Sequence, residues 1–311
     1  MTAVFASLIP VFLVIACGWL ARATGFVEER HWPGMERVTY VIFFPALVID
    51  TLARADLASV PVLGVGGALS CAILLMAGLL LALRRPLQTM LTVDGPSFTS
   101  LFQGATRWNT FVALALAGSL HGGRGVALMA VAIAAMVPLL NVLAIYVFVR
   151  FAGGPRQSAG QILKTFVTNP FIWSCAVGLA LNPVVPYLPK PSLAFVEITG
   201  RAALSAGLLI VGAGLDIRSL AKPGPVHILA IVLKLVVMPV VAVALARAFG
   251  VEGSDIAIAV IAASVPTASA AYVLARQLGG NAPLMAEILT LQTLLAMLTM
   301  PVMITVLTMQ L

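Results

Sequence analysis

Two apolar stretches of membrane-spanning length, residues 98–120 and 255–278, have polar or helix-breaking residues at their centres. These central residues are Arg107, Asn109 and Thr110 in the first stretch and Pro266 and Thr267 in the second. An arginine at mid-membrane costs roughly 2.5 to 3.5 kcal/mol to insert, so it persists mainly where it faces protein, water or an anion. Its planar guanidinium can hold a carboxylate through two parallel hydrogen bonds. Arg107 therefore indicates either a binding site for an organic anion or a structural tie to loose backbone carbonyls.

Both stretches contain reasons for a helix to unwind at mid-depth. Proline removes a backbone donor and clashes with the preceding turn, and unwound backbone within a membrane is tolerated only where it is buried in protein or lines a cavity. The second half of each broken helix would turn unpaired N–H groups and a positive helix end toward an anion. The residues expected to contact the substrate at these breaks are Arg107, Asn109, Thr110, Pro266 and Thr267. The alternative role for Asn109 is a simple helix cap.

Other polar residues also lie within apolar segments, namely Asn141, Lys234, Glu287 and Gln292. A lysine buried this deeply needs an anionic partner or must give up its charge, and Lys234 is too far from either end of its segment to reach water easily. We therefore expect Lys234 to pair with Glu287, either as a structural ion pair or for proton coupling, although the sequence leaves open whether the two are in contact. The alternative for Glu287 is simple solvation at the membrane interface. Asn141 and Gln292 are predicted to line the same cavity as Arg107, or else to bond helix to helix.

The composition indicates an integral membrane protein and argues against several other classes. The chain has 311 residues, of which 61% are hydrophobic and 9% charged, with a mean hydropathy of +1.09, far above a soluble domain. The net charge of +7 is spread singly through short loops and forms no basic face, so no nucleic-acid partner is expected. The three cysteines lack metal-site spacing, and no hydrolase, phosphate-loop or metalloprotease motif occurs. We therefore expect no enzyme activity, no cofactor and no metal.

Ten apolar segments have the length needed to cross a bilayer. They are residues 2–21, 36–53, 60–83, 98–120, 126–149, 161–181, 193–215, 226–249, 255–278 and 285–308. The longest polar connection, 151–160, combines Gly, Pro, Ser and Arg and divides the chain into two five-helix halves, 1–150 and 161–311. We predict an all-α integral membrane fold with ten transmembrane helices, of which the fourth and ninth are broken.

Successive loops between the predicted spans alternate between many and few basic residues. One set of loops holds eleven basic residues, namely Arg22, Arg30, Arg37, Arg84, Arg85, Arg150, Arg156, Lys164, Arg218, Lys222 and Arg276. The other set holds four, namely Arg54, Arg124, Lys190 and Arg247. The positive-inside rule places the first set in the cytoplasm. The sequence therefore predicts a multi-pass protein of the plasma (inner) membrane with both termini extracytoplasmic.

The two halves resemble each other at an offset of 156 to 160 residues. The matching pairs are Pro10 with Pro170, Gly18 with Gly178, Asp56 with Asp216, and Ala127 with Pro283. Aligning Leu120 with Leu278 also places Trp108 and Asn109 on Pro266 and Thr267. Because each half has an odd number of spans, the halves must insert in opposite orientations. This pattern favours an inverted repeat, which is typical of secondary transporters.

A set of short motifs runs through the chain in a characteristic order. The motifs are Phe44-Pro45-Ala46-Leu47, Arg107-x-Asn109-Thr110, Lys234 with Pro239, and Glu287 with Thr299-x-Pro301. With the five-plus-five layout, they resemble the auxin efflux carrier family, within the fold group of bile, arsenite and riboflavin transporters. The long central loop of the plant carriers is replaced here by about ten residues, so the chain is more similar to the bacterial branch. The resemblance implies a scaffold of spans one, two, six and seven beside a moving transport domain of spans three to five and eight to ten. It also implies that the broken fourth and ninth spans cross at mid-membrane.

The resemblance implies a carrier with elevator-type alternating access for a small organic anion, such as a malate-like or malonate-like dicarboxylate or a monocarboxylate, with an auxin-like substrate less expected. Two other functions stay open, an ion channel and a sodium-coupled organic anion symporter. A channel usually repeats polar residues along a pore, whereas here polarity is concentrated at two mid-span points. The sequence leaves open which anion is carried, the direction of transport, proton coupling against uniport, and whether the chain forms a homodimer.

Overall fold

The computed structural model describes the whole chain except residues 1, 56–61, 154–159, 161–169, 218–222 and 309–311. The described part is helical, with short connections and no strand, which confirms the all-α prediction. The helices of the first half are α1 (Thr2–Ala23), η1 (Glu29–His31), α2 (Trp32–Val38), η2 (Thr39–Phe43), α3 (Phe44–Ala53), α4 (Val62–Ala82), α5 (Arg84–Leu91), α6 (Gly95–Thr106) and α7 (Thr110–Phe151). Those of the second half are α9 (Pro170–Leu181), η4 (Asn182–Tyr187), α10 (Lys190–Ala213), α11 (Pro225–Val232), η6 (Leu233–Val237), α12 (Met238–Ala248), α13 (Ser254–Ser264), α14 (Ala270–Leu278) and α15 (Ala282–Thr308).

Six stretches of the described chain are long and apolar enough to cross a membrane. They are Val4–Ala23, Gly64–Ala82, Gly95–Phe151, Lys190–Ala213, Pro225–Ala248 and Ala282–Thr308. The stretch Gly95–Phe151 has 57 residues and covers the predicted fourth and fifth spans. Since a bilayer needs about 20 apolar residues per crossing, the chain is a multi-pass membrane protein.

Three predicted spans fall outside these six stretches. The span 36–53 is formed by α2, η2 and α3 and carries charges near both ends, and the span 255–278 is interrupted between α13 and α14. Of the span 161–181, residues 161–169 lie outside the described residues, and α9 forms the rest. Most of the predicted connection 151–160 also lies outside them, as do Arg156, Lys164, Arg218 and Lys222. The count of ten spans and the inverted repeat therefore stay predictions.

The largest difference in helix boundaries concerns α7. The sequence predicts two spans, 98–120 and 126–149, separated by a loop, but α7 runs through the junction with a kink at Gly122. The backbone of Gly122 has φ 59° and ψ −149°, which non-glycine residues rarely adopt. A single glycine thus turns the chain where the sequence predicts a longer loop.

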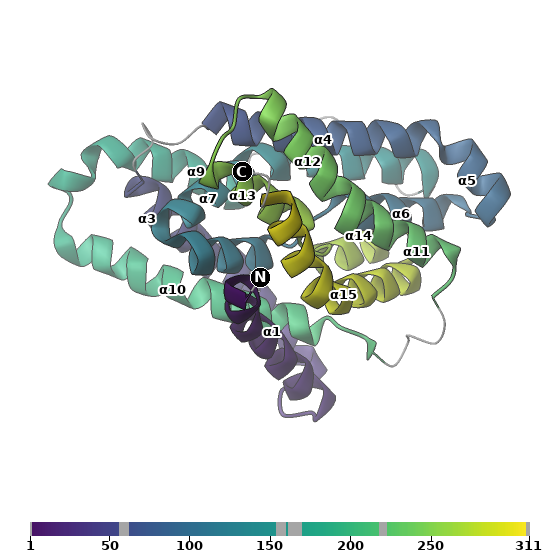
Figure 1. Cartoon of the computed structure of the whole chain (residues 1–311). Coiled ribbons are helices and arrows are strands. Elements are labelled where there is room, and N and C mark those ends of the chain that lie inside the picture. The colour runs from purple at the N-terminus through teal and green to yellow at the C-terminus, as the bar shows by residue number, and fades with distance from the viewer. Residues whose placement is uncertain (1, 56–61, 154–159, 161–169, 218–222, 309–311) are drawn as a thin grey trace.

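Helices α1, α3, α9 and α10 form one group, here called the scaffold group, and they pack through glycines. Gly18 of α1 lies against the backbone of Leu209 in α10, and Gly200 of α10 lies against Leu47 of α3. A Cβ at either glycine would overlap the opposing backbone. Small residues let membrane helices approach this closely. In Figure 1 these helices occupy the left and lower part of the molecule.

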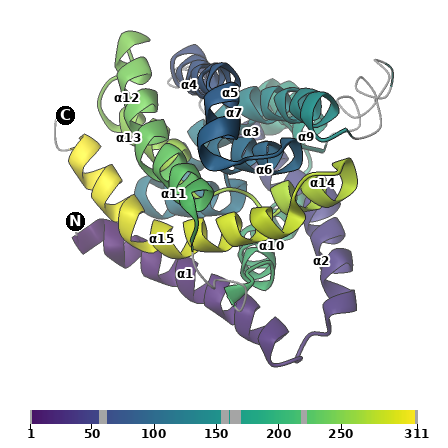
Figure 2. The ribbon, with the colours of Figure 1, turned by 90° about the vertical axis from the view of Figure 1, so that its right-hand side faces the viewer.

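The other group, here called the break group, surrounds the two interrupted helices. In it α4 packs against α7 and α12, α13 packs against α12 and α15, and α6 packs against α7 and α15. Figure 2 shows α15 lying along α1, so the two groups meet there. The beginning of α1 and the end of α15 lie near each other in both views.

Candidate functional site

The two helix breaks meet in the middle of the molecule. Helix α6 ends at Thr106 and α7 begins at Thr110, while α13 ends at Ser264 and α14 begins at Ala270. The two breaks are joined by a backbone hydrogen bond of 2.8 Å, in which the Asn109 N–H donates to the Pro266 carbonyl. Residues 157 positions apart along the chain are thereby held in one place.

The first break is shaped by a cap at the start of α7. Arg107 has extended backbone angles, φ −71° and ψ 155°, which end α6. Asn109 is the cap residue of α7, and its Oδ1 accepts a hydrogen bond of 3.2 Å from the Val112 N–H. The predicted cap role of Asn109 is therefore present, and it satisfies one of the unpaired N–H groups of the first turn.

The second break is held by Gln292 of α15. Its Oε1 accepts from the Thr267 N–H at 3.0 Å, and its Nε2 donates to the carbonyls of Gly104 at 2.8 Å and Ala230 at 3.0 Å. One fully buried amide thus ties α6, α11 and the break of α13 and α14 together. Buried polar groups need such partners because each unpaired group carries a desolvation penalty.

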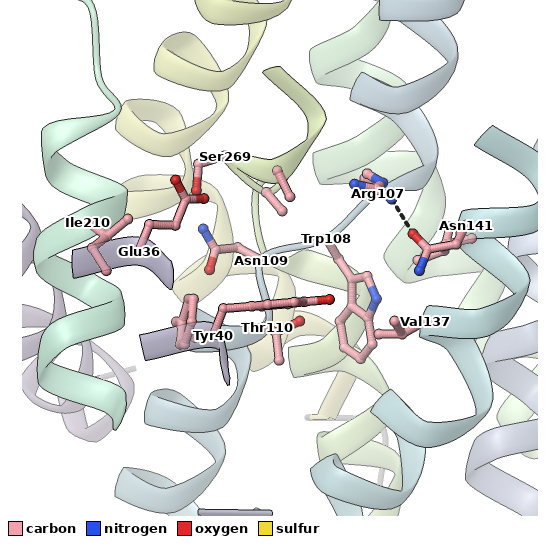
Figure 3. Close-up of a pocket in the computed structure, with 14 residues that line it drawn as sticks. Glu36, Tyr40, Arg107, Trp108, Asn109, Thr110, Val137, Asn141, Ile210 and Ser269 are labelled. Carbon is pink, nitrogen blue, oxygen red and sulfur yellow. Dashed lines mark hydrogen bonds between the residues drawn. The ribbon is translucent and has the colours of Figure 1, made fainter. Parts of the chain in front are cut away.

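A cavity lies where the breaks face the scaffold group, as Figure 3 shows. Its polar lining includes Glu36, Tyr40, Arg107, Asn109, Thr110 and Asn141. Its apolar lining includes Phe111, Val137, Leu140, Ile210, Ala268 and Ala270. The cavity volume is about 120 Å³, whereas one water molecule needs only about 10 to 15 Å³. The cavity therefore has room for a small organic molecule.

Arg107 provides the positive charge of the cavity. Its side chain is buried, with 7% of the residue exposed, and Nη2 donates to Asn141 Oδ1 at 2.5 Å. No ion pair links Arg107 to an acidic residue within the described part of the chain. A guanidinium has five N–H donors, so donors remain for a carboxylate after the bond to Asn141.

Two further donors in the cavity wall are buried and have no hydrogen-bond partner among the described residues. They are Asn109 Nδ2 and Trp108 Nε1. Because Asn109 Oδ1 accepts from Val112, its amide nitrogen is the atom left unpaired. A buried unpaired donor is unfavourable in an empty site, and an anion with several acceptor atoms would satisfy it.

The structure brings only some of the predicted site residues to the cavity. Arg107, Asn109, Thr110 and Asn141 line it, whereas Pro266, Thr267 and Gln292 do not. The Thr267 hydroxyl donates to the Gln103 carbonyl at 3.3 Å, and all polar groups of the Gln292 amide are used within the protein. These three residues do not line the cavity. They stabilise the helix breaks through hydrogen bonds within the protein.

The predicted pair of Lys234 and Glu287 is wrong. Lys234 Nζ donates to the Ala263 carbonyl at 3.2 Å, and Glu287 pairs with His227, whose Nε2 lies 2.6 Å from Glu287 Oε2. Lys234 lies in the π-helical turn η6 and reaches the last turn of α13. The C-terminus of a helix carries partial negative charge, so it attracts the ammonium group without any carboxylate.

Among the cavity residues that the sequence does not predict are Glu36, Tyr40, Trp108 and Phe111. Glu36 and Tyr40 are four residues apart in α2 and η2, a spacing that places both on one helix face. That spacing was visible in the sequence, but a glutamate near the start of a span is normally solvated. The π-helical turn at Thr39–Phe43, a feature frequent at functional sites, had no clear sequence signal.

Comparison with known protein families agrees with this architecture. A family model described as "Membrane transport protein" matches residues 154–304, just under half of the chain. The match includes the second helix break and α15 as far as Ile304. No curated protein matches the sequence. The second half of the chain is therefore similar to a transport family of the auxin efflux carrier type, and this match together with the apolar helices indicates a membrane transporter.

Proposed function

We propose that the chain is a secondary carrier that moves a small carboxylate-bearing organic anion across the plasma membrane. The observation that carries this proposal is a buried arginine in a cavity beside two helix breaks, which has no acidic partner within the part of the chain that the structure describes. In a low-dielectric site, preorganised donors interact with a carboxylate more strongly than they would in water. Arg107, the unpaired donors of Trp108 and Asn109, and the beginning of α7 all favour an anion in the same cavity.

Alternating access is the transport mechanism that the arrangement favours. The cavity is lined on one side by α2, η2 and α10, which belong to or continue the scaffold group, and on the other by the break group. A movement of the break group past the scaffold group would carry Arg107 and Asn109 with it. We propose an elevator-type movement of this kind.

Phe111 supports an inward-open state. This ring follows the first break and fits against Gly207 of α10, where a Cβ would overlap it. It also meets Phe44 edge-on, with ring centroids 5.6 Å apart and planes at 88°. We propose that this contact closes the external side of the cavity. Glu36 and Ile210 lie near helix ends that lead to loops predicted to be cytoplasmic, so the open side would face the cytoplasm.

Counterflow in proteoliposomes tests the carrier function. Vesicles containing the purified chain and an unlabelled substrate should accumulate the same substrate in labelled form, over a panel of mono- and dicarboxylates. Only a carrier exchanges labelled for unlabelled substrate, so uptake that is indifferent to internal substrate would indicate a channel. If no mono- or dicarboxylate of the panel is exchanged, the proposal is contradicted.

Energy coupling is proposed to be independent of sodium. The residues of the second break, from Ser264 to Ser269, include no acid, and a hard cation prefers charged oxygen ligands. Uptake should therefore persist when sodium is replaced by choline at constant membrane potential. Loss of uptake under those conditions would favour the sodium-coupled symporter instead.

Topology and assembly complete the proposal. We propose that both termini are extracytoplasmic, that the chain follows the bacterial branch of auxin-efflux-like carriers, and that it assembles as a homodimer. Reporters fused at each end should both indicate the external side, and a cytoplasmic terminus would remove the inverted repeat. Cross-linking and mass measurement in detergent would decide between dimer and monomer.

A further inference from the structure

The cavity contains one cation and one anion that are not paired with each other. Arg107 donates to the neutral side chain of Asn141. Glu36 is half-buried on α2, and its carboxylate makes no ion pair or hydrogen bond within the described part of the chain. In the view of Figure 3, Glu36 and Arg107 lie on opposite sides of the cavity.

Two separated, unpaired charges restrict which ligand fits. A monocarboxylate would neutralise Arg107 and leave Glu36 without a partner. A dicarboxylate would bring its second negative charge into the same low-dielectric space as Glu36, which is unfavourable. A ligand with one negative and one positive group would satisfy both residues and leave the occupied cavity electrically neutral.

The remaining lining is consistent with a ligand of two unlike ends. Trp108 and Asn141 lie on the same side as Arg107 in Figure 3, and the buried Trp108 Nε1 has no partner in the described part of the chain. Donors for a carboxylate thus gather beside the arginine. Apolar side chains, including Val137, Leu140 and Ile210, supply much of the remaining wall.

We propose that the substrate is a zwitterion, with a carboxylate held at Arg107, a cationic amino group facing Glu36, and an apolar segment between them. This inference rests on the proposed carrier function and on carboxylate binding at Arg107, but it replaces the organic anion by an amino carboxylate, which keeps the carboxylate and is neutral overall. Glu36 is then the residue that selects an amino carboxylate over a simple carboxylate or a dicarboxylate.

Matched ligand series test the inference in the counterflow assay. The probes are ω-amino acids of four to six carbons and leucine, each compared with the monocarboxylate of the same skeleton and, for the straight chains, with the dicarboxylate of the same length. The wild-type chain should prefer at least one amino carboxylate over its deaminated analogue by about tenfold or more. Glu36→Gln should remove that preference and improve the relative uptake of the dicarboxylate.

Two further variants separate a charge contact from a general effect. Glu28→Gln makes the same change in charge at an exposed position that pairs with Arg30 outside the cavity, and it should leave the preference unchanged. Glu36→Asp keeps the charge but shortens the side chain by one methylene. It should therefore shift the preferred ω-amino acid toward a chain about one carbon longer, an effect that misfolding would not produce.

The failures of the two proposals are distinguishable. If mono- or dicarboxylates exchange but no amino carboxylate does, the proposed zwitterionic substrate is wrong, while the proposed carrier function is kept. An unchanged preference in Glu36→Gln, or an unchanged optimum in Glu36→Asp, would also overturn it, since Glu36 would then be merely solvated at the mouth. Absence of exchange for every probe would contradict the carrier function itself.

Discussion

The two helix breaks meet through one backbone hydrogen bond, yet they present different side chains to the cavity. The first break supplies Arg107 and Asn109 to the lining. At the second break, Thr267 is fully buried and bonded to Gln292 and to the Gln103 carbonyl. Beyond it, only the small residues from Ala268 to Ala270 reach the cavity.

Similar interruptions of a helix therefore serve separate purposes in this protein. When Leu120 is aligned with Leu278, Arg107 corresponds to Val265 and Phe111 to Ser269. The first break therefore carries charge and a large ring, while the second carries an apolar residue and a small one. We interpret the first as the ligand-facing break and the second as its rigid support.

The largest effect expected from this comparison is on ligand binding at the first break. Arg107→Ala should weaken substrate binding by about 2 to 5 kcal/mol, because it removes one partner of a desolvated charge pair. Arg107→Lys should restore part of the loss, since it keeps the charge but not the bidentate geometry. Substrate affinity and melting temperature are measured for each variant. An alanine variant that binds normally but melts far lower would make Arg107 a structural tie.

The next effect is on stability at the second break. Gln292→Leu should lower the free energy of unfolding by about 2 to 5 kcal/mol, because three hydrogen bonds are lost and each is worth roughly 0.6 to 1.7 kcal/mol within a membrane. Ligand affinity of the folded variant should change little. Thermal unfolding in detergent, with and without substrate, separates the two quantities.

Gln103→Leu is the matched control. Gln103 is also buried, but within the described residues its side chain makes a single hydrogen bond, to the Ala271 carbonyl, and its Oε1 has no partner. Its replacement by leucine should therefore be less destabilising than that of Gln292. Equal losses for the two variants would contradict the assignment of Gln292 as the support of the second break.

The positions of the breaks could be predicted from the sequence because their signals are local. Proline at position 266 and the polar run around Arg107 disfavour a continuous apolar helix whatever surrounds them. The side of each helix that faces the cavity could not be predicted in the same way. Gln292 and Asn141 are both amides within apolar helices, yet only Asn141 lines the cavity, since rotation and packing of the helices decide this.

The wrong pairing of Lys234 with Glu287 has a related cause. Opposite charges within apolar segments suggest a pair, but the sequence does not show that a helix end can take the place of the carboxylate. Nor does it show that His227, at the beginning of α11, comes within reach of Glu287. Long-range partners of polar residues therefore required the three-dimensional arrangement.

A third test concerns the ring that distinguishes the first break from the second. Gly207→Ala should destabilise the described state by about 1 to 3 kcal/mol, because the new methyl group overlaps Phe111 and overpacking costs that much. Gly78→Ala in α4 is the control, since no atom would lie within 4 Å of its new Cβ. The Phe111→Ser change places the residue type of the second break at this position. In the Phe111→Ser background the further change Gly207→Ala should cost little, and an undiminished cost there would contradict the contact as the source of the loss.

The smallest expected effects concern the residues that begin the two C-terminal half-helices. Asn109 accepts a hydrogen bond from Val112 as the cap of α7, whereas Ser269 makes no side-chain cap bond at the start of α14. Asn109→Ala should therefore lower stability by about 1 kcal/mol, and Ser269→Ala by a few tenths. Chemical or thermal unfolding of both variants measures this difference.

Asn109→Ser then separates the two roles of the asparagine. Serine is a good cap residue, so this variant should melt close to the wild-type temperature. It lacks the amide nitrogen, however, and that atom is the buried donor left unpaired in the cavity. If the nitrogen binds substrate, affinity should fall by about 1 kcal/mol, the value of one hydrogen bond, while stability is kept. Unchanged affinity in Asn109→Ser would reduce Asn109 to a cap, and Arg107 would then be the main polar contribution of the first break to the ligand.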